Sequence, residues 1–387
     1  MKWKFYSLAF VAGMSILTAC SSDDNNDNDG NGNGNEIENG TILKGTITSD
    51  VTLAAGNTYK LSGEYIVEEG ATLHIEEGVK IIAVYDDIAD YILVKQGGKI
   101  NAVGTPDKPI VMTSEKEEPG AWGGIHICGR AHTNAEGGKG SSEIGGAVYG
   151  GNDDADNSGT LQYIRLEYTG FAFDEEHEAN GISFYGVGNG TIVDHCQAYK
   201  GSDDGFEFFG GSVNVSNLVA VSCSDDSFDW TEGWNGKGTN LVAYQEDKST
   251  LGYDCDCLME CDNNGSNNAA TPVAHPVLKN LNLVGNGGSK QGIRLRAGTE
   301  VEIDNAKVCG KGQPLTVETA LTENALKNGT SKLTNITLTS ELSSKEGIYT
   351  HADFIAVTSN KVDANLSYSS FEDIRKECSW MNGSWVK

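Results

Sequence analysis

The alternation of apolar and polar residues between positions 193 and 230 repeats after 22 positions. Residues 193–208 are followed, without an insertion, by a similar run at 215–230. Each copy contains two short alternating stretches separated by Gly, Ser and Asp, and neither has helical periodicity. A period of this length is typical of stacked repeats that bury their faces on one another. We predict an all-β fold, a single-stranded right-handed parallel β-helix with rungs of about 22 residues, an N-terminal cap and long loops.

One four-residue pattern marks the same strand in successive rungs. The order small, apolar, polar, apolar occurs at 181–184, 205–208, 227–230, 252–255 and 292–295. Alternate side chains of a strand point to opposite faces, so the apolar pairs should stack inside the coil. The polar residues should then form one outward column, with neighbours about 4.8 Å apart. This predicted column consists of Ser183, Glu207, Asp229, Asp254 and Arg294.

Three loop segments interrupt the rungs, and a fourth segment forms the end of the chain. Residues 131–158 are rich in Gly and Asp, and a loop of that length is usually functional or disordered. Residues 262–275 are expected to form a second loop, and 174–178 an acidic loop on the side of the column. Residues 371–387 contain Trp380 and Trp385, and we expect this apolar segment to cap the last rung.

The N-terminus has the pattern of a lipoprotein signal. Lys2 and Lys4 precede an apolar run at 5–17, which ends at Leu17-Thr18-Ala19-Cys20. That tetrapeptide resembles a bacterial lipobox, in which the Cys carries the lipid anchor. We therefore predict a signal peptide at 1–19, lipidation at Cys20, a disordered Asp/Asn/Gly tether at 20–40 and the β-helix domain at 41–387.

Composition and charge limit the classes of molecule that the protein is expected to bind. The chain has 49 Gly and 6 Pro among 387 residues, as expected for many tight corners. Its formal net charge is −27, which would repel nucleic acids, and also uronic-acid polysaccharides unless a divalent cation bridges the two. Eight Cys follow Cys20, and an oxidising compartment would favour disulfides. We expect Cys255, Cys257 and Cys261 to form a disulfide cluster.

Two acidic runs, 202–205 and 224–226, lie one rung apart. Unit charges about 4.8 Å apart repel by roughly 3.5 kcal/mol at an effective dielectric of 20. A bound cation, raised carboxyl pKa values or exposure to water would each relieve this repulsion. Calcium, which prefers six to eight oxygen ligands, is the candidate cofactor, and a solvated acidic flank is the alternative. The candidate ligands are Asp203, Asp204, Glu207, Asp225, Asp226, Asp229 and Asp254.

The same residues allow an enzymatic interpretation. A calcium-assisted polysaccharide lyase needs an Arg or Lys base, and a glycoside hydrolase needs two carboxyl groups flanking the bond. The catalytic candidates are Asp203, Asp225, Asp226, Asp229 and Arg294. The acidic runs are distantly similar to the aspartate motifs of polygalacturonase-type hydrolases, but the Gly-His-Gly motif is missing and 292–296 matches Arg-Ile-Lys poorly. Trp234, at a corner beside Gly233, is the candidate for stacking on a sugar.

Three blocks carry a family resemblance. Residues 119–125, 149–154 with 157–161, and 202–208 with 224–233 resemble recurring blocks of a family of Bacteroidetes β-helix surface lipoproteins. The resemblance implies the fold and an outer-membrane, surface-exposed location, but no particular activity. We expect a non-catalytic lipoprotein that binds a glycan or a cell surface, with calcium. A polysaccharide lyase or glycoside hydrolase is the first alternative, and a structural surface protein is the second.

Overall fold

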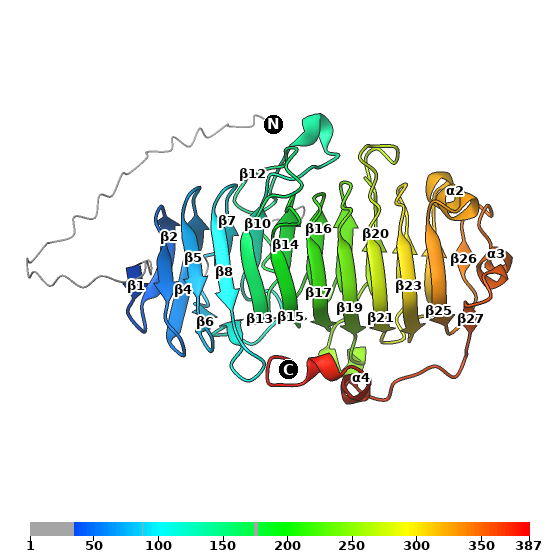
Figure 1. Ribbon diagram of the computed structural model, residues 1–387. Helices are drawn as coiled ribbons and strands as arrows, with labels where there is room; N and C mark the ends of the chain where they lie inside the picture. The colour runs from blue at the N-terminus through cyan, green and yellow to red at the C-terminus, as the bar shows by residue number, and fades with distance from the viewer. Residues whose placement is uncertain (1–34, 87, 174–176) are drawn as a thin grey trace, which may run out of the picture. The chain divides into compact units, whose positions relative to one another are not determined.

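The computed structural model describes residues 35–86, 88–173 and 177–387, all within one compact unit. Among these residues 25 strands join in one sheet, and each strand pairs in parallel with the equivalent strands of neighbouring rungs. Figure 1 shows the rungs following one another along the coil. The predicted parallel β-helix is confirmed.

Each rung contributes to three faces. Face 1 consists of β1 (Asn35–Ile37), β3 (Val51–Leu53), β5 (Thr72–Ile75), β8 (Lys99–Val103) and the first halves of the long strands. The long strands are β13 (Gly159–Glu167), β15 (Ile192–Tyr199), β17 (Asn214–Val221), β19 (Lys237–Tyr244), β21 (Val277–Val284), β23 (Glu302–Cys309) and β25 (Lys332–Leu338). Their second halves form face 2 with β6 (Lys80–Ala83), β9 (Ile110–Ser114), β27 (Lys361–Val362) and the first halves of β2 (Ile42–Ile47) and β4 (Thr58–Val67).

Face 3 is built from short strands. After the second halves of β2 and β4 come β7 (Tyr91–Val94), β10 (Ile125–Cys128), β14 (Ile182–Tyr185), β16 (Phe206–Phe209), β18 (Phe228–Thr231), β20 (Met259–Cys261), β22 (Gln291–Leu295), β24 (Gln313–Val317) and β26 (Ser343–Ser344). The segment predicted as an N-terminal cap is itself made of rungs. The first of these rungs begins with β1, which lies inside the range predicted as a disordered tether. This part of the range is ordered, because Ile37 packs against the core.

A single residue in the left-handed backbone conformation makes the bend between faces 1 and 2. Its φ is between 51° and 64° in successive rungs, and Asn is enriched in this conformation. The residues are Tyr163, His195, Asn217, Asn240, Asn280, Asn305 and Asn335. The asparagine ladder is defined as Asn217, Asn240, Asn280 and Asn305. From Asn240 onward, each Nδ2 donates to the Oδ1 of the preceding member at 2.8–3.0 Å.

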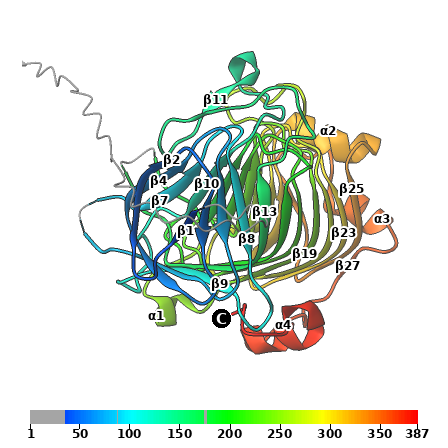
Figure 2. The same ribbon diagram turned by 60° about the vertical axis from the view of Figure 1, so that its left-hand side comes forward.

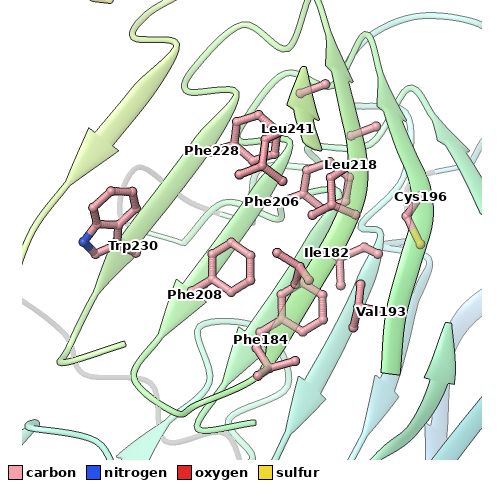
Figure 3. Close-up of a cluster of buried hydrophobic side chains, with 14 of the residues drawn as sticks. Ile182, Phe184, Val193, Cys196, Phe206, Phe208, Leu218, Phe228, Trp230 and Leu241 are labelled. Atoms are coloured by element: carbon pink, nitrogen blue, oxygen red, sulfur yellow. The ribbon is translucent and has the colours of Figure 1, made fainter. Parts of the chain in front are cut away.

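The apolar pairs of the motifs at 181–184, 205–208, 227–230 and 292–295 lie inside the coil, as predicted, and Figure 3 shows those of the first three. The rings of Phe184 and Phe208 stack with centroids 5.0 Å apart, and those of Phe206 and Phe228 with centroids 5.6 Å apart. Successive rungs bring equivalent residues into register, which places Phe184 beside Phe208 and Phe206 beside Phe228. This continuous core fixes the positions of the polar residues that alternate with it.

One rung departs from the predicted pattern. The helix α1 (Lys248–Leu251) ends at Gly252, and the chain then continues as a loop to β20. Asp254 lies in that loop, with its side chain 46% exposed and bonded to Asn286. The prediction of a strand at 252–255 is therefore wrong. The same apolar–polar–apolar pattern recurs at 259–261, and this later copy forms the strand.

The loops and chain end surround the coil. Residues 131–158 form an excursion with the turn η1 (Glu136–Gly138) and the hairpin β11 (Gly140–Ser141) and β12 (Val148–Tyr149), and 262–275 form a second loop. Near the last rungs lie α2 (Ala320–Asn328) and α3 (His351–Ala356), with Phe354 buried in the core. Figure 2 shows these helices at the edge of the coil. Within the described residues every helix is too short or too polar to cross a lipid bilayer.

The C-terminal strap, residues 371–387, does not cap the last rung as expected. It contains α4 (Phe371–Glu377) and η2 (Ser379–Met381) and runs back along the coil (Figure 1). Ile374 and Trp385 are buried against Val219 and Val242, whose side chains point out of face 2. The strap thus covers an outward apolar surface that the alternating pattern leaves on this face.

The expected disulfides are also absent from the described residues. All eight Cys there are buried free thiols. Cys196, Cys223 and Cys261 pack in the main core, where they serve as small apolar side chains.

Candidate functional site

The strand register of face 3 builds the acidic column. Ser183 lies beside Glu207, Glu207 beside Asp229, Asp229 beside Glu260, and Glu260 beside Arg294. Glu260 therefore takes the position predicted for Asp254. Because each of these residues lies between two core residues of its strand, its side chain points outward.

A second row of acids lies at the corner that precedes these strands. Asn180 Oδ1 accepts a hydrogen bond from the backbone N–H of Asp204 at 3.2 Å. Asp204 Oδ1 accepts from the N–H of Asp226 at 2.8 Å, and Asp226 Oδ1 from that of Cys257 at 2.6 Å. One oxygen of each Asp is thus used to join adjacent rungs. These bonds hold both carboxyl groups in place close to the column.

The two rows and the neighbouring loops line an open pocket of about 360 Å³, the acidic pocket. Glu143 reaches it from the 131–158 excursion, and Glu178 from the loop after β13. Arg294 is the single basic residue among the described residues that line it. The acidic residues that line it are Glu143, Glu178, Asp203, Asp204, Glu207, Asp225, Asp226, Asp229, Asp256 and Glu260.

The pocket strongly disfavours negative charge. Burial, followed by the charge of neighbouring carboxylates, raises the pKa of Asp203 to about 7 and that of Asp225 to about 6. The same two causes raise the pKa values of Asp204, Glu207, Asp226 and Asp229 well above the usual range. Protons or a cation must therefore compensate the carboxylates at neutral pH.

The carboxylate oxygens of the pocket are arranged in overlapping sets. In three groups of acidic residues, carboxylate oxygens lie within 4.8 Å of one another: Asp203, Asp204 and Asp225; Asp204, Glu207 and Asp229; and Asp226, Asp229 and Glu260. Asp229 belongs to two sets, and its Oδ1 is buried without a hydrogen-bond donor among the described residues. A buried, unpaired carboxylate oxygen is costly unless an ion or a water satisfies it. The donor set, which is almost entirely oxygen, suits a hard cation such as calcium.

The comparison with protein families identifies the fold family. A family model described as a pectate-lyase like beta helix domain matches residues 45–386. The chain belongs to this family. Searches of curated proteins and of solved structures gave no match. The pectate-lyase-like fold is found in lyases and hydrolases, so membership establishes the fold and leaves the activity open.

In this pectate-lyase-like β-helix, Arg294 is poorly suited to act as a base. Its guanidinium contacts Glu260 at 2.8 Å and Glu318 at 3.3 Å. Burial alone would lower its pKa, but the hydrogen bonds and charges of both glutamates raise it above the usual value. Arg296 pairs with Glu260 and Asp262 on the same side. Cations thus pair with Glu260, Asp262 and Glu318 at this end of the pocket, whereas burial and neighbouring carboxylates dominate around Asp203, Asp204 and Glu207.

The structure brings most predicted site residues together. Asp203, Asp204, Glu207, Asp225, Asp226, Asp229 and Arg294 all line the acidic pocket, whereas Asp254 does not. The prediction that Trp234 stacks on a sugar is wrong, because only 1% of this residue is exposed. Its ring stacks on Phe208 at 4.2 Å, and its indole N–H donates to the Val213 carbonyl at 3.2 Å. The turn at Gly233, with φ 86°, precedes this inward-directed ring.

Four further acidic residues were missed. Glu260 follows the same apolar–polar–apolar pattern as the predicted members, and Glu178 lies in the acidic loop already expected near the column. Glu143 and Asp256 have no such signal, because they enter the pocket from a long excursion and from the loop before β20. The predicted lipidation site, Cys20, lies outside the described residues.

Proposed function

We propose that the protein is a non-catalytic, calcium-binding β-helix protein that recognises an acidic glycan through cations held in the acidic pocket. The observation that carries this proposal is the buried, unpaired Oδ1 of Asp229 within two overlapping sets of carboxylates. A divalent cation there would supply the missing partner and would offset the charge that burial opposes.

Calcium fits the donor chemistry better than the other common cations. The three carboxylate sets offer oxygen atoms only, which disfavours zinc, a metal usually bound through nitrogen and sulfur. Magnesium demands near-ideal octahedral geometry and keeps several waters, whereas calcium accepts six to eight ligands in flexible arrangements. A cavity of about 360 Å³ has room for more than one ion and for ligand oxygens.

The glycan part of the proposal follows from charge. A chain of net charge −27 repels a polyanionic saccharide. Calcium ions shared between the pocket and the carboxylates of a uronic-acid chain would turn this repulsion into attraction. With a lipid anchor at Cys20, the protein would hold such a glycan at the outer-membrane surface. A structural surface protein would instead bind neither cation nor glycan.

A lyase or glycoside hydrolase is the second candidate. The observation that favours it is the pair Asp203 and Asp225, whose pKa values of about 7 and 6 suit proton transfer near neutral pH. The position of Arg294 between Glu260 and Glu318 argues against it as the base of a lyase. We therefore rank binding above catalysis.

Calcium titration by calorimetry tests the proposal. The parent protein should bind calcium more tightly than magnesium, and the Asp225→Asn/Asp229→Asn double variant should lose this binding. The Asp107→Asn variant, at an exposed turn, is the matched control and should behave as the parent. Absence of heat in the parent would refute the calcium site.

A second experiment separates binding from catalysis. Polygalacturonate should bind the parent in calcium and dissociate when EDTA is added, without any change in its chain length. Formation of unsaturated or shortened products, lost in Asp225→Asn, would instead establish the enzymatic alternative.

A further inference from the structure

A second pocket lies at the opposite edge of face 2, between the asparagine ladder and the C-terminal strap. Its volume is about 290 Å³, and we call it the ladder pocket. Asn240, Asn280 and Asn305 line one side, at the bend between faces 1 and 2. Glu377 and Trp380 of the strap line the other side. The acidic pocket, in contrast, lies on face 3 and at its corner with face 2.

The ladder amides offer a regular set of donors and acceptors. Asn280 donates one N–H to Asn240 and accepts one from Asn305. An Asn side chain has two N–H donors and two acceptor positions on its oxygen. Asn280 therefore keeps one N–H donor and one acceptor position that the ladder does not use. Asn280 and Asn305 are exposed, which places these free groups in reach of a ligand. Groups that both donate and accept match hydroxyls well.

Trp380 adds an aromatic surface to the same pocket. Of the tryptophans in the described residues, Trp122, Trp230, Trp234 and Trp385 are buried, whereas Trp380 is half-buried. Trp385 packs beside it at 6.2 Å between ring centroids, and the His195 ring lies edge-on at 6.4 Å. The indole is thus held in place while part of it stays accessible. Such a fixed ring beside hydrogen-bonding groups can contact a ligand that has an apolar face and a polar edge.

The charge of the ladder pocket differs from that of the acidic pocket. Its only charged lining residues within the described chain are Lys307 and Glu377, which form an ion pair at 2.6 Å. Tyr368 donates a hydrogen bond to the same glutamate at 3.0 Å. The lining therefore carries no net charge in a chain of net charge −27. This neutrality favours an uncharged ligand over a polyanion or a cation.

We propose that the ladder pocket binds a neutral saccharide. The ladder amides would bond its hydroxyls, and Trp380 would pack against the C–H face of a sugar ring. The inference goes beyond the proposed function, because the ligand is uncharged and its binding needs no calcium. The site also gives the C-terminal strap a role besides covering face 2, since the strap supplies the aromatic wall.

The test uses the whole protein with EDTA present. Neutral hexasaccharides of glucose, mannose and N-acetylglucosamine are titrated by calorimetry and by tryptophan fluorescence, with a galacturonate oligomer as the charged comparison. At least one neutral hexasaccharide should bind with a dissociation constant of about 1 mM or tighter. Trp380→Ala should weaken that binding by roughly tenfold or more, a loss expected for a stacking residue. Tyr85→Ala, an exposed aromatic residue elsewhere, is the matched control and should leave it unchanged.

A charge variant tests the neutrality of the pocket separately from the indole. Lys307→Met breaks the neutrality of the pocket without touching the ladder or the indole, and circular dichroism of every variant must match the parent. The resulting negative pocket should still bind the neutral sugar and should exclude the galacturonate oligomer. Absence of binding by all neutral hexasaccharides, or binding that is unaffected by Trp380→Ala, would overturn the proposal. Either result leaves calcium binding in the acidic pocket untouched, so the two proposals fail separately.

Discussion

Replacing Asp229 by Asn should have opposite effects on stability in the absence and in the presence of calcium. Asn keeps the size of the side chain and removes its charge. Asp229 has carboxylate neighbours on both sides, with oxygens of Asp226 and Glu260 in one set and of Asp204 and Glu207 in the other. Without a cation the charge is a cost, and with a cation it becomes a ligand.

The magnitude follows from the geometry. Two unit charges about 4.8 Å apart repel by roughly 3.5 kcal/mol at an effective dielectric of 20. Proton uptake can relieve this repulsion, but it costs about 1.4 kcal/mol for each pH unit above the pKa of the unfolded chain. Both routes cost several kcal/mol at about pH 8, so Asp229→Asn should raise the free energy of unfolding in EDTA by about 2–4 kcal/mol.

The pH dependence has a definite sign. A carboxyl group whose pKa is raised by folding binds more protons in the folded state than in the unfolded state. Its contribution to stability is therefore fully present below its unfolded pKa and is lost as the pH rises toward its folded pKa. For Asp203 that window runs from 3.8 to about 7, and the loss corresponds to about 4 kcal/mol. The stability of the metal-free protein should fall across this range, and the advantage of Asp229→Asn should vanish near pH 4.

Thermal unfolding followed by circular dichroism measures both effects. In EDTA at about pH 8 the variant should have the higher Tm, by several degrees. Calcium at one hundred times its Kd should stabilise the parent by about 2.7 kcal/mol and the variant by much less. A variant that is less stable than the parent in EDTA, or an equal calcium shift in both proteins, would refute the reasoning. Asp107→Asn should follow the parent under every condition.

Three further predictions concern a core residue, a ladder residue and a residue of the acidic pocket. Trp234→Ala should lower the free energy of unfolding by about 3–5 kcal/mol in urea titrations, because its buried ring stacks on a core phenylalanine. An effect below that of the half-buried Trp380→Ala would contradict this assignment. Asn280→Ala should lower the free energy of unfolding by about 1–3 kcal/mol, because it removes two ladder hydrogen bonds and places alanine at a φ of 60°. Asn280→Gly should relieve only the backbone strain at this φ and should not restore the lost hydrogen bonds. Arg294→Gln should tighten calcium binding in calorimetry by removing the cation from the pocket, while unchanged or weaker binding would place calcium away from Glu260.

The sequence predicted the acidic column correctly in those rungs that have nearly the same length. The motifs at 205–208 and 227–230 are 22 residues apart without an insertion, so pattern and register coincide. The pattern alone therefore places Glu207 and Asp229 side by side. In the next rung the same pattern occurs twice, at 253–255 and at 259–261, and the alternation is equally good in both. The folded structure selects Glu260 over Asp254, because α1 and the loop after it precede β20, whose pairing with β18 places Glu260 beside Asp229.

The amino-acid sequence by itself determined the coil, its period, the stacked apolar core and most of the acidic column. These features depend on the two-residue alternation of a strand and on repetition, and both are local properties. The tertiary structure decided the inward direction of Trp234, the return of the C-terminal strap over face 2, and the entry of Glu143 and Glu178 into the acidic pocket. Each of these depends on how loops of unequal length cross the rungs. A loop carries no periodicity that would reveal its path, so the acidic pocket with its raised pKa values appears only when the chain is folded.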